Sequence, residues 1–116
     1  MNDSLATTPD PPYFAVVFTS IRTTADDAGY EATASRMMDL ASKQPGFLGV
    51  ESVRGDDGVG VTVSYWRDLD SIHRWHEVGE HLEAQVLGRS KWYSQFQLRI
   101  CRVERDYRFD ADGADC

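Results

Sequence analysis

Two hydrophobic periods divide the chain into strands and helices. Residues 13–20 are apolar at both alternate sets of positions, which is typical of a strand covered on both faces. Between Thr24 and Pro45, apolar residues recur every three or four positions, as they do on one face of a helix. Pro45 and Gly46 cannot continue that helix. The N-terminal part therefore predicts a central strand followed by one helix.

The next segment predicts an antiparallel hairpin. The strand-like runs Phe47–Arg54 and Val59–Trp66 flank residues 55–58, Gly-Asp-Asp-Gly, which are typical of a tight turn. A second helix is expected to begin after this hairpin. Either Asp68 or Asp70 can cap it, because a short carboxylate can accept the free backbone N–H groups of the first turn.

The second helix presents an apolar face that includes Ile72 and Trp75. We expect a break or kink at Gly79, because glycine destabilises a helix interior. The helical pattern then resumes and stops at Gly88. In Tyr93–Val103 apolar and polar residues alternate, which predicts a last strand with one face toward water.

Alternation also assigns side chains to the two faces of the sheet. In the second hairpin strand we expect the apolar set to face the helices, and this set is Val59, Val61, Val63 and Tyr65. The other set of that strand is expected to face away from the helices, and it is Thr62, Ser64 and Trp66. The polar set of the last strand is expected on the same far face, and it is Gln95, Gln97 and Arg99. Such a face is too polar for a dry core. We therefore expect two subunits to pack these faces together, with a partly polar cavity between the sheets.

The predicted order β-α-β-β-α-β is typical of the α+β ferredoxin-like fold, in which two helices cover one face of a four-stranded antiparallel sheet. A chain of 116 residues is close to the commonest domain size, so we expect one domain. It is predicted to span residues 13–105. Residues 1–12 form a flexible Pro-rich lead, and residues 106–116 form an acidic tail.

Charge narrows the range of partners. With 12 basic and 19 acidic residues, the net charge of −7 repels nucleic-acid phosphates and anionic lipid surfaces. Neither nucleic acid nor a membrane is an expected partner. The start of the chain lacks the basic and apolar stretches of a secretory signal, so we expect a cytoplasmic protein. Cys101 and Cys116 show neither a disulfide framework nor a metal-binding spacing.

A turn, a strand end and a helix form a combined pattern. The segments are Gln44-Pro45-Gly46-Phe47-Leu48-Gly49-Val50, then Val63-Ser64-Tyr65-Trp66-Arg67-Asp68, then Ile72 to Trp75, and His81 to Gly88 with Trp92-Tyr93. Together they resemble the antibiotic biosynthesis monooxygenase family over most of the chain. The resemblance implies a dimeric α+β barrel. It implies one of three roles: a cofactor-free oxygenase of polycyclic aromatics such as anthrones, an enzyme that opens haem, or a subunit of no established activity.

The haem-opening branch of that family implies three residues: an asparagine on the first strand, a tryptophan in the second helix and a histidine about ten positions later. Trp75 matches the tryptophan. Gln85 stands at the histidine position, and Thr19 or Ser20 stands near the asparagine position. Glutamine is a poor iron ligand beside imidazole, so haem would need His81 as a substitute ligand. We therefore expect no cofactor, with haem kept as an alternative.

Three tryptophans are candidates for binding a flat aromatic guest through ring contacts: Trp66, Trp75 and Trp92. Gln85 joins them as a candidate substrate-binding residue, because the resemblance places it at the histidine position of the haem-opening branch. The alternative for Trp75 is plain core packing. For Trp66 and Trp92 it is a plug at the end of an element.

Cofactor-free oxidation needs a base that removes a proton from an activated phenol or methylene group. His76 or His81 has a suitable ordinary pKa, about 6.5, and Arg99 can stabilise the resulting enolate. The alternative is that both histidines are surface groups. His73, His76, Glu77 and Glu80 share one sector of the helix but lack the His-Glu-x-x-His order, so no metal site is expected.

These patterns favour an oxygenase-like homodimer that binds a small, flat, partly apolar molecule and oxidises it without a cofactor. Two alternatives remain open. One is a non-catalytic ligand-binding or stress-related dimer that uses the same cavity, because a fold does not determine a function. The other is a haem-binding or haem-degrading protein.

Overall fold

The computed structural model describes residues 5–25, 27–85 and 92–111, and for residues 80–85 it describes the backbone alone. The elements follow the order β-α-β-β-α-β. They are β1 (Tyr13–Arg22), α1 (Asp27–Ser42), β2 (Phe47–Arg54), β3 (Val59–Trp66), α2 (Leu69–Gln85) and β4 (Tyr93–Val103). The predicted element order is therefore confirmed.

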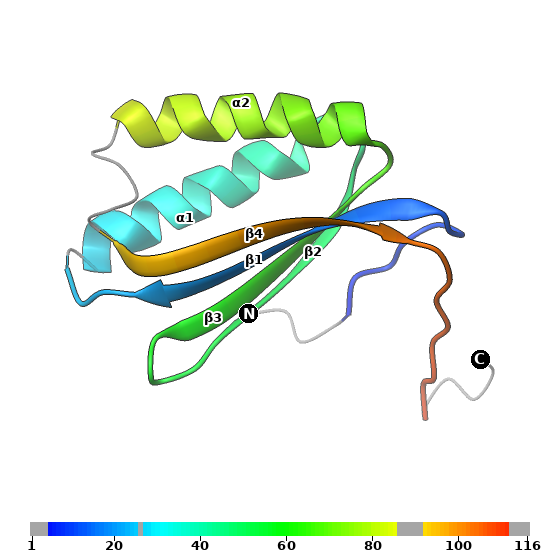
Figure 1. The fold of residues 1–116 in the computed structure, drawn as a ribbon, viewed down its shortest axis with the longest axis horizontal. Coiled ribbons are helices and arrows are strands. Elements are labelled where there is room, and N and C mark those ends of the chain that lie inside the picture. The colour runs from blue at the N-terminus through cyan, green and yellow to red at the C-terminus, as the bar shows by residue number, and fades with distance from the viewer. Residues whose placement is uncertain (1–4, 26, 86–91, 112–116) are drawn as a thin grey trace.

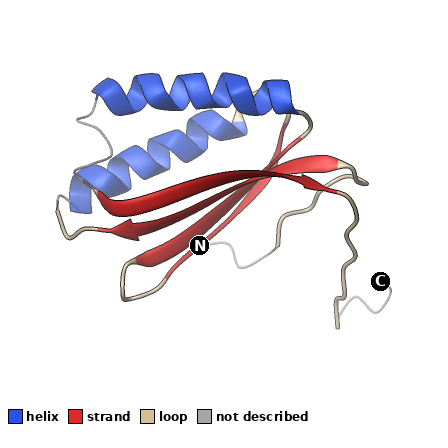
Figure 2. Ribbon diagram, in the orientation of Figure 1, coloured by secondary structure: helices blue, strands red, loops and turns tan. Residues whose placement is uncertain are grey.

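The strands form one antiparallel sheet in the order β2-β3-β1-β4, so β1 is central, as predicted. Both helices lie over the same face of this sheet (Figures 1 and 2). The described part of the N-terminal lead lies on the opposite side, and the described part of the C-terminal tail extends away from the end of β4 (Figure 1). The structure thus has the predicted ferredoxin-like fold. We call the sheet face beneath the helices the inner face and the opposite one the open face.

Our assignment of β3 side chains to these faces is wrong. Trp66 is 0% exposed and packs against Val16 and Ile72, so it lies beneath α2 on the inner face. Thr62 and Ser64 share the parity of Trp66 and also face the helices. Val59, Val61, Val63 and Tyr65 consequently lie on the open face. The inner face surrounds a cavity, described below, and small polar side chains leave the room for it.

The faces of β4 follow from its register with β1. Phe18 on the inner face pairs with Leu98, and Val16 pairs with Ile100. Phe96, Leu98 and Ile100 therefore point to the helix side, although they are 38%, 43% and 52% exposed because β4 is an edge strand. The polar set, Gln95, Gln97 and Arg99, lies on the open face as predicted.

The second helix begins at an aspartate cap and continues without a break. The Ser71 backbone N–H donates to Asp68 Oδ1 at 2.8 Å, and hydrogen bonds from Ser71 lower the pKa of Asp68. Contrary to our prediction of a kink, α2 continues through Gly79 to Gln85. A Cβ at Gly79 would lie 3.3 Å from Met37 Cε, so this glycine lets the two helices approach closely.

Gly46 offers a direct test of the connection between α1 and β2. Its φ is +87°, and an added Cβ would lie 2.0 Å from Ser71 Oγ. We expect Gly46→Ala to lower the free energy of unfolding by about 2 kcal/mol or more, because strain and a steric clash add. Urea denaturation measures this. Gly55→Ala, at an exposed turn glycine without a positive φ, is the matched control. A loss of under about 0.5 kcal/mol in Gly46→Ala would contradict the packing described here.

The open face is covered at one end by the lead. The Ala6 N–H donates to Glu51 Oε2 at 2.9 Å, and the Tyr65 hydroxyl donates to Glu51 Oε1 at 2.7 Å. Burial, and then the Glu51 hydrogen bond, raise the pKa of Tyr65. Tyr13 packs edge-on against Tyr65 with ring centroids 5.9 Å apart.

Neither α1 nor α2, as far as the structure describes the chain, is long and apolar enough to cross a membrane.

Candidate functional site

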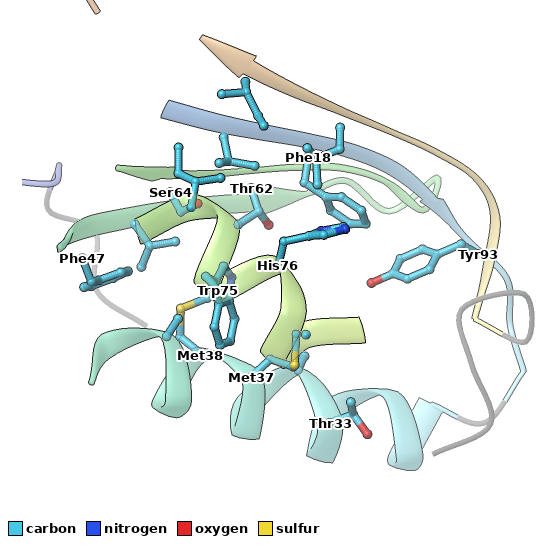
Figure 3. A pocket seen from close by; sticks show the side chains of 18 of the residues that line it. Phe18, Thr33, Met37, Met38, Phe47, Thr62, Ser64, Trp75, His76 and Tyr93 are labelled. Atoms are coloured by element: carbon cyan, nitrogen blue, oxygen red, sulfur yellow. The ribbon is translucent and has the colours of Figure 1, made fainter. Parts of the chain in front are cut away.

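A cavity of about 530 Å³ lies between the inner face of the sheet and the two helices (Figure 3). Its size falls within the range of about 300–1,000 Å³ that is usual for small-molecule sites. We expected a cavity on the open face, between two subunits, and the structure instead places one within a single chain. Thr62 and Ser64 on β3 and Gly79 on α2 line it. The small side chains of Thr62 and Ser64, and the lack of one at Gly79, leave space that larger side chains would fill.

One wall of the cavity is the indole of Trp75. This residue is half-buried, lines the cavity, and stacks on Trp66 with ring centroids 6.2 Å apart and an interplanar angle of 24°. Trp66 is fully buried behind it and does not line the cavity. Phe47 packs edge-on against Trp66 with ring centroids 5.4 Å apart. A deep aromatic core therefore supports the aromatic wall.

A second aromatic group lies where β1, α1 and the start of β4 meet. Trp92 is 4% exposed and lines the cavity, as do Tyr30 and Tyr93. The Tyr30 ring packs edge-on against Trp92 and Tyr93, with ring centroids 6.1 Å and 5.9 Å apart. Phe18 packs edge-on against Tyr93 at 5.5 Å. A flat apolar guest would thus meet aromatic rings at two places along the cavity.

His76 on α2 and Tyr93 on β4 both point into the cavity, where the Tyr93 hydroxyl is directed toward its centre (Figure 3). His73 also lines the cavity, but its side chain is 74% exposed and lies 3.9 Å from the Glu77 carboxylate. His76 is exposed as well, but its imidazole points into the cavity, so of the two described histidines it is the better placed to exchange a proton with a guest. No described residues form a group of three metal-ligating side chains.

The predicted catalytic residues do not all meet at this cavity. Arg99 is exposed on the open face and donates to Gln97 Oε1 at 2.9 Å, so it does not reach His76 within one chain. His81 and Gln85 belong to α2, but their side chains lie outside the described residues. Of the predicted set, His76, Trp75 and Trp92 line the cavity, and Trp66 supports it from behind.

Of the three residues implied by the haem-opening branch, this chain has only the tryptophan, Trp75. Trp75 lies in the cavity wall. Ser20 is 1% exposed, and its hydroxyl accepts a hydrogen bond from Arg54 at 2.9 Å. Gln85 falls outside the described side chains. The described residues thus contain no counterpart of the histidine ligand of that branch, and we derive no haem chemistry for this chain.

Sequence reasoning missed Arg54, Tyr30 and Tyr93, all of which line the cavity. Arg54 is the last residue of β2 and pairs with Gly60 across the hairpin. Trp66 is the largest apolar side chain of β3 and shares its parity with Gly60. Placing Trp66 in the core would therefore have placed Arg54 beneath the helices. That signal was present in the sequence.

The sheet, the two helices over its inner face and the cavity between them define a ferredoxin-like α+β protein with an internal small-molecule-sized space. Residues 12–87 match the family model described as antibiotic biosynthesis monooxygenase. The chain belongs to this family, so the resemblance seen in the sequence is confirmed.

Three known proteins illustrate the relationship. The uncharacterized protein YqjZ of Bacillus subtilis is 49% identical over 115 residues, which cover 99% of this chain and 100% of YqjZ. The crystal structure of SnoaB, a cofactor-independent oxygenase from Streptomyces nogalater, is 19% identical and has a TM-score of 0.63, with 84% of this chain and 97% of SnoaB covered. PA3566 from Pseudomonas aeruginosa is 14% identical with a TM-score of 0.64, covering 85% and 99%. The two solved structures share the fold.

Proposed function

We propose that the cavity binds a small, flat, mainly apolar aromatic molecule and that the protein oxidises this guest with molecular oxygen and without a cofactor. The observation that carries the proposal is the cavity itself, which is walled by Trp75 and reached by His76. Family membership supports it. At the level of the fold, so does SnoaB, which is a cofactor-independent oxygenase.

The chemistry assigned to this site begins with a proton. His76 removes one proton from an activated methylene or phenol of the guest, and the resulting carbanion transfers an electron to oxygen. Recombination gives a peroxide, which loses water, so that a CH₂ group and O₂ become a C=O group and H₂O. Trp75 and the rings around Trp92 hold the guest and keep water away from the carbanion.

A non-catalytic ligand-binding dimer is the second candidate, and the position of Arg99 favours it. Because Arg99 lies on the open face, one chain does not bring the expected enolate-stabilising cation to His76. The same cavity then binds a guest without oxidising it. Oxygen uptake separates the two functions, since binding alone consumes none.

Oxygen consumption with an anthrone measures the proposed reaction. We expect the parent to consume oxygen and to form the corresponding anthraquinone. His76→Gln should lower this rate roughly 100-fold, within the usual range for a general base. Arg99→Gln, which changes a residue on the opposite face, should keep the rate within about threefold of the parent. Saturable anthrone binding without oxygen uptake would instead identify a binding protein.

We further propose that the protein is a homodimer joined by the open face. An apolar strip on this face consists of Val17, Val61 and Val63, which are half-buried, and of Val53, which is 68% exposed. A soluble monomer rarely exposes a continuous apolar patch of this kind, so we expect a second subunit to bury it.

Sedimentation velocity at micromolar concentration tests the dimer. We expect the parent to sediment as a dimer and Val61→Lys as a folded monomer, because the cross-strand neighbours of position 61 are the uncharged Thr19 and Val53, so a lysine there would bury a charge without a carboxylate opposite it. Ala32→Lys, on the exposed side of α1, introduces the same side chain elsewhere and should leave the dimer intact. A parent that sediments as a stable folded monomer would contradict the proposal.

A further inference from the structure

Arg54 places a positive charge in a cavity whose described lining carries no negative one. The side chain is half-buried and lines the cavity at the end of β2. The described lining residues include no aspartate or glutamate, although the chain carries 19 acidic residues. No carboxylate among the described residues lies within 4.0 Å of the guanidinium. A cation that is partly removed from water and lacks a counter-charge favours the binding of an anion.

Neutral oxygens hold this guanidinium in place. Arg54 Nη1 donates to the Gly58 carbonyl at 2.5 Å, and Nη2 donates to Ser20 Oγ at 2.9 Å and to the Tyr30 hydroxyl at 3.3 Å. A Cβ at Gly60, its cross-strand partner, would lie 2.6 Å from Arg54 Cζ. The guanidinium therefore lies directly against the backbone of Gly60, in a space that an ordinary side chain would fill. Its orientation is set before any guest arrives.

The neighbouring arginine shows what is unusual about Arg54. Arg22 lies over the Tyr30 ring, with Cζ 3.8 Å from the ring centroid, and its charge is balanced by Asp27 at 2.7 Å. Tyr30 thus joins two guanidinium groups, of which Arg22 alone is paired with a carboxylate among the described residues. Because no described carboxylate pairs with Arg54, its positive charge can attract an anionic group of a guest.

A buried donor without an acceptor among the described residues lies next to this cluster. Trp92 packs against Tyr30, and its buried Nε1–H has no hydrogen-bond partner among the described residues. A buried donor without an acceptor is unfavourable, so native proteins rarely keep one without a reason. This end of the cavity therefore combines a cation and an unsatisfied N–H, and an acceptor-rich group on the guest would complement both.

We propose that Arg54 forms a subsite for an anionic oxygen group, so that the guest is an aromatic carboxylate or an ionised phenol or enolate. The proposal rests on the aromatic guest proposed above and narrows its chemical class. A guanidinium binds oxyanions through charge-assisted hydrogen bonds, and the Nε–H and one Nη1–H of Arg54 are not used by the neutral oxygens that hold it. The net charge of −7 opposes an approaching anion at long range, so the selectivity comes from contacts within the cavity.

Two matched probes test the subsite by isothermal titration calorimetry: anthraquinone-2-carboxylate and the uncharged anthraquinone-2-carboxamide. We expect the parent to bind the acid roughly tenfold more tightly than the amide, as charge-assisted hydrogen bonds contribute about that much. Arg54→Gln should reduce the preference to less than about twofold and change the affinity for the amide by less than about threefold.

Gly60→Ala is the second variant, because it keeps Arg54 and displaces its guanidinium. It should weaken acid binding more than amide binding, whereas Arg54→Lys should keep part of the preference through its charge alone. If Arg54→Gln fails to fold, Arg54→Lys and Gly60→Ala still test the subsite. Equal binding of both probes by the parent, or equal weakening of both by Arg54→Gln, would reduce Arg54 to a structural residue and leave the aromatic site standing. Failure of both probes to bind the parent would overturn the aromatic site as well.

Discussion

Replacing Trp66 with alanine is expected to lower the free energy of unfolding by about 3–5 kcal/mol, the largest effect on stability predicted for any substitution here. Trp66 is 0% exposed, and it contacts the core residues Val16 and Ile72 and the ring of Phe47. Removal of the indole leaves a void that these packed neighbours cannot fill. A small domain has a total stability of only about 5–15 kcal/mol, so the variant should be close to unfolded at physiological temperature.

Chemical denaturation of Trp66→Ala and Trp66→Phe together measures this effect. Phenylalanine retains a ring that can contact Phe47 and Trp75, so we expect it to lose clearly less stability than alanine. It also loses the Nε1–H that donates to Ser64 Oγ at 2.9 Å. A loss of under about 1.5 kcal/mol in Trp66→Ala would show that the core is not centred on this residue.

The second large effect concerns binding and falls on Trp75. Because this indole is half-buried and lines the cavity, Trp75→Ala should weaken the binding of an anthraquinone probe by roughly tenfold to hundredfold. Trp75→Phe keeps an aromatic surface but loses contact area and the indole N–H. It should therefore weaken binding less, and cost under about 1.5 kcal/mol of stability.

The thermal midpoint and the probe affinity of Trp75→Phe, measured on the same preparation, distinguish a cavity wall from a core residue. A cavity wall loses affinity and keeps most of its midpoint. A large fall in midpoint with an unchanged affinity would make Trp75 a core residue and remove it from the site.

The positions of the elements followed closely from the sequence. Both hairpin strands, Phe47–Arg54 and Val59–Trp66, were predicted with the bounds that the structure shows, because glycines at both ends of residues 55–58 define the turn. β4 was predicted just as well from its alternation. Periodicity and turn residues are local properties, so they can be read without knowledge of the packing.

The alternation of residues in β3 does not determine which of its side chains face the helices, because both alternating sets of side chains can be buried. Val61 and Val63 suggested a core, yet the inner face carries Thr62 and Ser64, since a cavity replaces the core there. Likewise Gly79 suggested a kink, and the close approach of Met37 that accounts for it arises from tertiary structure. Arg54 was missed because Trp66, which has the same parity as its partner Gly60, was assigned to the open face. Its partners Ser20 and Tyr30 come from other elements, and their meeting depends on the fold.

The most direct test of the account is whether a guest enters the space between the helices and the sheet. Met37 and Met38 on α1 line this cavity (Figure 3). Val63 lies on the open face. With ¹³C-methyl labels on methionine and valine, titration with an anthraquinone probe should shift the Met37 and Met38 methyl signals through the ring current and leave those of Val63 nearly unchanged. Shifts at Val63 with unmoved Met37 and Met38 signals at saturation would place the guest on the open face and contradict the account.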